Sequence, residues 1–183
     1  MNARDFNITA LLSMRHSGIE NYIVPGLTSY LIGNPSPHGT VRMFECDREH
    51  QEAVTPHSHR FGFQCWVLRG SVRNRIWTRG GLTGDFYYAS RLVYGGQVGT
   101  YTREEIADPC GRWSYHDHVH EEGECYSMTA DQIHSIYFSR GARVLFFEGP
   151  TTRDYSTILE PWVGERIPTL RTESWMFRRE DEA

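Results

Sequence analysis

After residue 40, the chain alternates between short apolar runs and turn residues such as glycine, asparagine and aspartate. Many short strands separated by regular turn signals are typical of a β-sandwich or a β-barrel. We therefore predict an all-β fold for this part of the chain. The predicted strands are Val41–Cys46, Gln64–Leu68, Val72–Trp77, Phe86–Val93, Gln97–Thr102, Glu124–Met128, Ile133–Phe138 and Arg143–Phe147.

Two of these runs, CWVL at 65–68 and RVLFFE at 143–148, are apolar at successive positions. This pattern favours a strand that is covered on both faces, or one that is buried in a dimer interface. An exposed edge such as RVLFFE would also pair with its copy in a second chain. We therefore expect a homodimer.

The N-terminal region differs, because residues 5–23 favour a short helical segment. Asp5 is a candidate N-cap, and Gly18 is expected to break the helix. The apolar residues that share one face at helical spacing are Ile8, Leu11 and Leu12.

The chain is long enough for one domain, which we place at 1–183. We expect an N-terminal helical or extended arm at 1–40, a barrel at 41–150 and a C-terminal tail at 151–183. Aromatic residues among charges indicate that the tail packs on the barrel exterior. These residues are Trp162, Trp175 and Phe177.

The composition argues against several classes of protein. The formal net charge of -4 offers no basic bias for a nucleic-acid backbone. No apolar run approaches the ~20 residues that span a bilayer, and we find no signal-peptide pattern, so no membrane partner is expected. The four cysteines are scattered without a C-x-x-C pair, which favours reduced thiols and a cytoplasmic protein.

The segment TPHSHRFGFQ at 55–64 carries the clearest chemistry. Residues i and i+2 of a strand point to the same face, so His57 and His59 can aim two imidazoles at one point. Two such nitrogens suit a borderline divalent metal. A third ligand must come from elsewhere, and His134, near the start of a predicted strand, is the candidate.

These residues resemble the motifs of the cupin superfamily. The first cupin motif is H-x-H, four residues, Glu and then a glycine turn. This chain has His57-x-His59, four residues, Gln64 and, after five more residues, Gly70. The match is one residue short at the glycine, and Gln64 replaces the usual glutamate.

The second cupin motif is G, five residues, P-x-G, two residues and His, and its spacing is matched by Gly123, Thr129, Asp131 and His134. Thr129 and Asp131 replace the usual proline and glycine, and Phe138 replaces the closing asparagine. The chain is also similar to small cupins of bacteria and their phages. The resemblance implies a jelly-roll barrel that holds one metal ion through His57, His59 and His134.

The loss of the usual glutamate changes the expected chemistry. A neutral set of three histidines leaves a divalent ion with a net charge of +2, which favours a carboxylate, enediolate or thiolate in its open positions. Gln64 either contacts the site or makes a core hydrogen bond. Arg60 follows the histidine pair and is a candidate clamp for a substrate carboxylate or phosphate, with a surface ion pair as the alternative.

A second group of histidines comprises His116, His118 and His120. If this stretch is a strand, the three side chains line one face and could form a second metal site. If it is a solvated loop at the mouth of the barrel, we expect no metal there.

The resemblance implies a metal-dependent enzyme that acts on a small polar or anionic substrate. We expect first an Fe(II) dioxygenase, with Gln64 and Arg60 orienting the substrate. A zinc, manganese or nickel ion would instead act as a Lewis acid in an isomerase or lyase. Two other readings stay open, a non-catalytic module that binds a small ligand and an interaction protein in which the barrel is only a scaffold.

Overall fold

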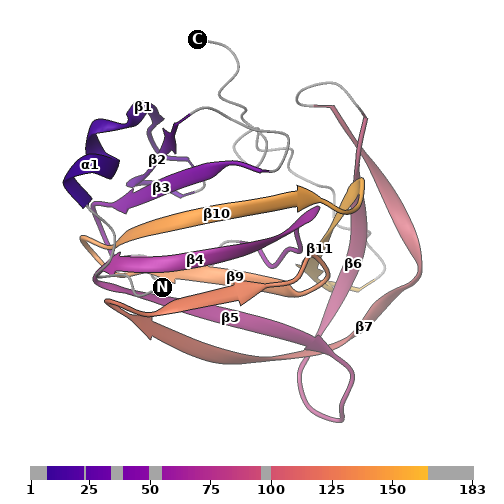
Figure 1. Ribbon diagram of the computed structural model, residues 1–183. Coiled ribbons are helices and arrows are strands. Elements are labelled where there is room, and N and C mark those ends of the chain that lie inside the picture. The colour runs from indigo at the N-terminus through magenta and orange to yellow at the C-terminus, as the bar shows by residue number, and fades with distance from the viewer. Residues whose placement is uncertain (1–7, 23, 34–38, 50–54, 96–99, 165–183) are drawn as a thin grey trace.

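The computed structural model describes residues 8–22, 24–33, 39–49, 55–95 and 100–164. It consists of two antiparallel sheets with the main core between them (Figure 1). Its elements are α1 (Ile8–Ser13), β1 (Arg15–Ile19), β2 (Leu27–Ile32), β3 (Val41–Cys46), β4 (Phe61–Arg69), β5 (Ser71–Arg79), β6 (Asp85–Tyr94), β7 (Tyr101–Glu121), β8 (Cys125–Met128), β9 (Ile133–Phe138), β10 (Arg143–Thr151) and β11 (Tyr155–Pro161). Within these residues, no helix is both long enough and apolar enough to cross a membrane.

The strands form two sheets, and the chain passes back and forth between them. One sheet has the order β1-β2-β3-β10-β4-β8, and the other has the order β11-β6-β7-β5-β9. Consecutive strands such as β4 and β5 lie in different sheets, so the chain crosses repeatedly between the layers, as in a double-sheet jelly roll. The prediction of an all-β barrel is confirmed at this level.

Gly70 makes one of these crossings, between β4 and β5. Its φ is +71°, and a Cβ there would lie 2.8 Å from Ser139 Oγ and 3.1 Å from Ala142 Cα. Both the backbone angle and the close approach require glycine. This is the glycine of the first cupin-like motif, and it turns the chain from one sheet into the other.

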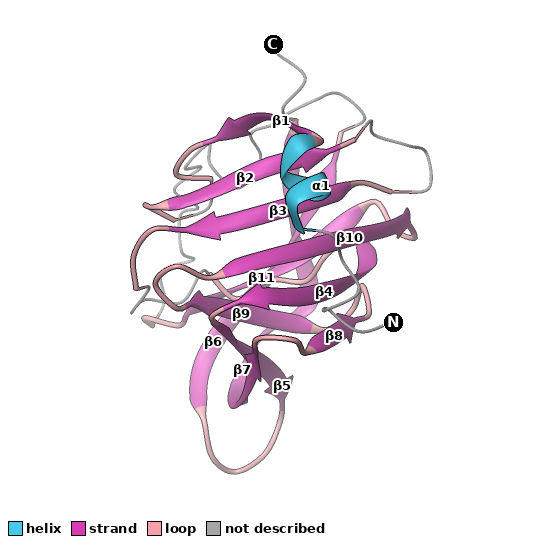
Figure 2. Ribbon diagram, turned by 60° about the vertical axis from the view of Figure 1, so that its left-hand side comes forward, coloured by secondary structure: helices cyan, strands magenta, loops and turns pink. Residues whose placement is uncertain are grey.

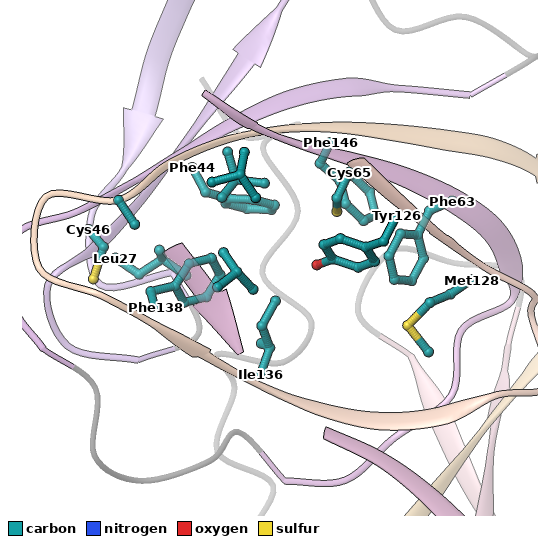
Figure 3. Packing of buried hydrophobic residues seen from close by; sticks show 14 residues of the cluster. Leu27, Phe44, Cys46, Phe63, Cys65, Tyr126, Met128, Ile136, Phe138 and Phe146 are labelled. Atoms are coloured by element: carbon teal, nitrogen blue, oxygen red, sulfur yellow. The ribbon is translucent and has the colours of Figure 1, made fainter. Parts of the chain in front are cut away.

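The main core is filled by apolar side chains from both sheets (Figure 3). Phe63 and Cys65 enter it from β4, and Phe146 enters it from β10. Ile136 and Phe138 enter it from β9, on the other sheet. The alternate residues of β4 point inward, which fixes the direction of every side chain along this strand.

The predicted helix over 5–23 is wrong beyond Ser13. Arg15–Ile19 form β1, which pairs with β2 at the edge of the six-stranded sheet (Figure 2). A Cβ at Gly18 would lie 2.6 Å from a ring carbon of Tyr30, so glycine permits the close packing here. Sheet pairing overrides the weak helical pattern, and Asp5 lies outside the described residues.

The RVLFFE run is not an exposed edge. β10 lies in the middle of its sheet, between β3 and β4. Val144 and Phe146 are buried in the core between the sheets, while Leu145 is buried in a second apolar cluster on the other face. The unbroken apolar pattern therefore reflects burial on both faces, and pairing of two chains through this run is excluded.

The homodimer remains a prediction, but the RVLFFE run does not supply the interface that was expected for it. Light scattering at tens of micromolar protein should give twice the chain mass of 21.2 kDa. A mass equal to that of one chain would contradict it.

The predicted tail begins with a strand. β11 pairs along its length with β6, and Trp162, just beyond it, stacks on Tyr88 with ring centroids 6.0 Å apart. Trp175 and Phe177 lie outside the described residues, so the packing predicted for them stays a prediction.

Candidate metal centre

The segment 55–59 lies between β9 and β11 and forms isolated β-bridges to both at His57. The backbones of His57 and His134 exchange two hydrogen bonds of 2.9 Å, and His57 also bridges to Ile158. On the β11 side, the Ser58 N–H donates to the Thr157 carbonyl at 2.8 Å. The segment thereby links the two edge strands of the five-stranded sheet, and it fixes the backbone that carries the H-x-H pair.

Three imidazoles converge beside this segment, from His57, His59 and His134. Their ligand nitrogens all lie within 4.8 Å of one another. The Nε2 atoms of His59 and His134 are 3.0 Å apart. The structure therefore brings together the three histidines that the sequence singled out.

A hydrogen bond orients the ring of His57. Its Nδ1 lies 2.7 Å from the carbonyl oxygen of Thr55. A carbonyl can only accept, so Nδ1 carries the proton and Nε2 keeps its lone pair. His57 is thus held in the tautomer that can bind a metal through Nε2.

Asn74 orients the ring of His134 in the same way, through a hydrogen bond. The Nδ1 of His134 lies 2.7 Å from Asn74 Oδ1, and the Asn74 amide nitrogen lies 3.3 Å from the sulfur of Met128. The amide group donates to sulfur on one side and accepts from the imidazole on the other. His134 therefore also presents an Nε2 lone pair, and a partner of this kind commonly supports a metal-binding histidine.

The separation of 3.0 Å between the two Nε2 atoms fits a shared ion. Nitrogens about 2.0–2.1 Å from one ion, at angles of about 90° to 109°, would be about 2.8–3.4 Å apart. Without an ion, two lone pairs at this distance would repel, so one nitrogen must carry a proton. Because Asn74 holds the His134 proton at Nδ1, His59 is the donor of that hydrogen bond.

Burial lowers the pKa of all three histidines, and for His59 and His134 it does so to well below the usual value. The second contribution for His59 and His134 is repulsion from neighbouring imidazoles. In the described part of the chain, no carboxylate contributes to these shifts. The donor set is neutral, as three-histidine metal centres require.

These lowered pKa values predict that the metal-free protein loses stability in acid. The unfolded chain binds protons at these positions below about pH 6.5, whereas the folded chain stays neutral to lower pH. Stability therefore falls as the pH drops below about 6.5, by up to about 1.4 kcal/mol per pH unit for each histidine. Urea unfolding at pH 7.5 and 5.5 would measure this loss. The variant with all three histidines replaced by asparagine should lose less, and equal losses would contradict the assignment.

Among the described residues, neither Gln64 nor Arg60 makes a hydrogen bond with the three histidines. The alternation of β4 continues without a break through Phe63 and Cys65, so Gln64 is exposed on the opposite face. The guanidinium of Arg60 lies over the ring of Tyr94, with Cζ 4.3 Å from its centroid. The expected role of both residues in orienting a substrate stays a prediction.

Aromatic rings take the positions beside the histidines. The ring centroid of Phe63 lies 4.8 Å from that of His59, and Phe61 lies 5.4 Å from it. Phe146 of β10 packs on Phe63 at 4.8 Å. Phe61 and Phe63 continue the alternation of His57 and His59 along the chain, and this period of two was the signal that could have identified them.

Comparison with protein-family models gave no match, and comparison with curated proteins gave none either. Among solved structures, the chain is similar to an RmlC-like cupin from Shewanella frigidimarina, with 11% identity, a TM-score of 0.40 and coverage of 76% of this chain and 96% of that one. It is similar to Pac13, described as a nucleoside dehydratase, with 10% identity, a TM-score of 0.43 and coverage of 82% and 88%.

The chain is also similar to hydroxypropylphosphonic acid epoxidase from S. wedmorenis, with 10% identity and a TM-score of 0.46. This match covers 75% of this chain and 56% of the epoxidase, so the chain spans little more than half of that protein. A cupin is thus among the similar structures.

Proposed function

We propose that this chain is a metal-dependent enzyme of the cupin type, in which His57, His59 and His134 hold one divalent ion. The observation that carries the proposal is the convergence of three neutral imidazoles, two of them fixed in the tautomer that binds metal. When bound, iron would supply adjacent positions for substrate and O2, whereas zinc, manganese or nickel would supply a Lewis acid. We favour iron and an oxidoreductase of the dioxygenase type.

The proposed substrate is a small molecule with a polar or anionic group. Three neutral ligands leave the +2 charge of the ion uncompensated, and in buried surroundings this charge attracts an anion strongly. Arg60 stays the proposed clamp for this group, whereas Gln64 is exposed on the opposite face of β4 from Phe63. A carboxylate, an enediolate or a thiolate is the group that we expect to bind.

The neighbouring residues would prepare the site. Asn74 and the Thr55 carbonyl keep two rings oriented, so little reorganisation is needed when a ligand binds. Phe61 and Phe63 pack against His59 and exclude water from that side. We further propose that the enzyme is a cytoplasmic homodimer without a nucleic-acid or membrane partner.

Metal analysis of protein purified without a His tag or added metal tests the proposal. One iron per chain, followed by O2 uptake with small carboxylates, enediols or thiols, would support the dioxygenase. Zinc, manganese or nickel at the same level would redirect the proposal to an isomerase or lyase. If no ion binds even after anaerobic reconstitution, the metal-dependent enzyme is refuted and a non-catalytic binding module becomes the better reading.

A further inference from the structure

The histidines of β7 are not used by the proposed centre, yet the strand register relates them to it. Ile76 of β5 pairs with His134 on one side and with His116 on the other. Side chains of directly paired residues point to the same face of an antiparallel sheet. His116 and His134 therefore share a face, with backbones two strand spacings or about 10 Å apart.

His118 lies on the same face, because it pairs with Asn74, the residue that orients His134. The ring centroids of His116 and His118 are 4.8 Å apart, the same separation as between His57 and His59. Both β7 rings are exposed, unlike the buried His134. In the described part of the structure, neither ring makes a hydrogen bond, so their nitrogens are open to a ligand.

Within the residues that the structure describes, the C-terminal end of β7 is paired with another strand on one side only. β6 pairs with β7 only as far as Trp113, so among the described strands residues 114–121 are paired on the β5 side alone. The run is therefore an edge strand. The alternative prediction, a solvated loop, is therefore wrong for this segment. The prediction that His116, His118 and His120 line one face of a strand is confirmed.

Two neighbouring side chains, those of His120 and Asp117, cannot add a ligand to the pair formed by His116 and His118. The ring of His120 stacks on Tyr126, with centroids 4.3 Å apart, and lies nearly parallel to the ring of His118 at 6.4 Å. Parallel rings at this distance do not converge on one ion. Asp117 points to the opposite face, where it accepts two hydrogen bonds of 2.7 and 2.9 Å from Arg75. The pair therefore offers two nitrogen ligands.

We propose that His116 and His118 form a second, exchangeable metal site, separate from the three-histidine centre, that takes Cu²⁺ or Ni²⁺. Imidazole nitrogens suit the later first-row ions, and Cu²⁺ binds such ligands most tightly, whereas Mg²⁺ and Ca²⁺ prefer oxygen. With two protein ligands, this site binds its ion more weakly than the buried centre does. The inference does not depend on the reaction proposed for that centre.

Titration of metal-free protein with Cu²⁺, followed by calorimetry and electron paramagnetic resonance, tests this site. The unmodified chain should bind two ions with different affinities, and the variant His116→Gln/His118→Gln should bind only the tighter one. The matched control is His16→Gln, an exposed histidine of β1, which should still bind two. His59→Ala should lose the tighter ion and keep the weaker one, so the two centres can be judged separately.

Two results would overturn the inference. One is a double variant that still binds two ions with unchanged affinities. The other is an equal loss of the weaker ion in the His16→Gln control, which would indicate unspecific binding to exposed histidines. Circular dichroism would verify that each variant is folded, which we expect because both β7 rings are exposed.

Discussion

Replacing His59 by alanine is expected to remove most of the tightly bound metal from the folded protein. His59 Nε2 lies 3.0 Å from His134 Nε2, and both nitrogens belong to the same group of three. Without His59, only two protein nitrogens remain. The loss of affinity should exceed the 10- to 100-fold that removal of a supporting residue typically costs.

The matched control is His118→Ala. This histidine also stands on a strand with a second imidazole two residues away, but it is exposed and no third nitrogen converges on it in the described residues. It should leave the tightly bound metal unchanged. The measurement is metal content after dialysis, with circular dichroism as the test of folding. If His118→Ala loses this metal while His59→Ala keeps it, the centre has been assigned to the wrong histidines.

The strands that the sequence predicted correctly are those in which at least one face is buried. Val41–Cys46 and Ile133–Phe138 match β3 and β9 at both ends. Every residue of β9 is buried, and β3 buries Met43, Phe44 and Cys46. β7 was not foreseen as a strand of 21 residues, since most of its side chains are at least partly exposed. A strand that is stabilised mainly by pairing with its neighbours leaves little hydrophobic pattern to recognise.

The candidate site shows what motif spacing can and cannot predict. The histidines lie where the cupin-like spacing placed them, because alternation along one strand and a turn before the next fix their direction. Gln64 also has the cupin spacing, but it is an odd number of residues from His59. Unless a bulge shifts the strand, an odd step points to the other face. The pairing with β10 does shift between Phe63 and Phe61, but the extra residue lies on β10, because Glu148 pairs with Phe63 and Thr151 with Phe61.

Asn74 could not be recognised from the sequence at all. Polar residues in strands are usually exposed, and nothing in the local pattern shows that Asn74 is 3% exposed beside His134. Its partners come from β8 and β9, more than fifty residues further along the chain. Only the register between distant strands reveals its role, which makes Asn74 the more demanding test of the proposed centre.

Replacing Asn74 by leucine should weaken metal binding by about 10- to 100-fold, although Asn74 is not itself proposed as a ligand. Without the Oδ1 acceptor, the buried Nδ1–H of His134 has no partner. The imidazole then gains by moving its proton to Nε2, where it can donate to His59, and this tautomer blocks the nitrogen that the ion needs. Competition with a chelator of known affinity would measure the loss.

The variant Asn74→Asp separates this tautomer effect from simple damage to the core. A carboxylate accepts the Nδ1–H more strongly than an amide does, and its negative charge partly offsets the charge of the ion. Asn74→Asp should therefore bind metal at least as tightly as the unmodified chain, although it loses the contact from the amide nitrogen to Met128. Equal weakening in both variants would mean that Asn74 acts only by packing. Unchanged affinity in Asn74→Leu would mean that it does not control the tautomer of His134.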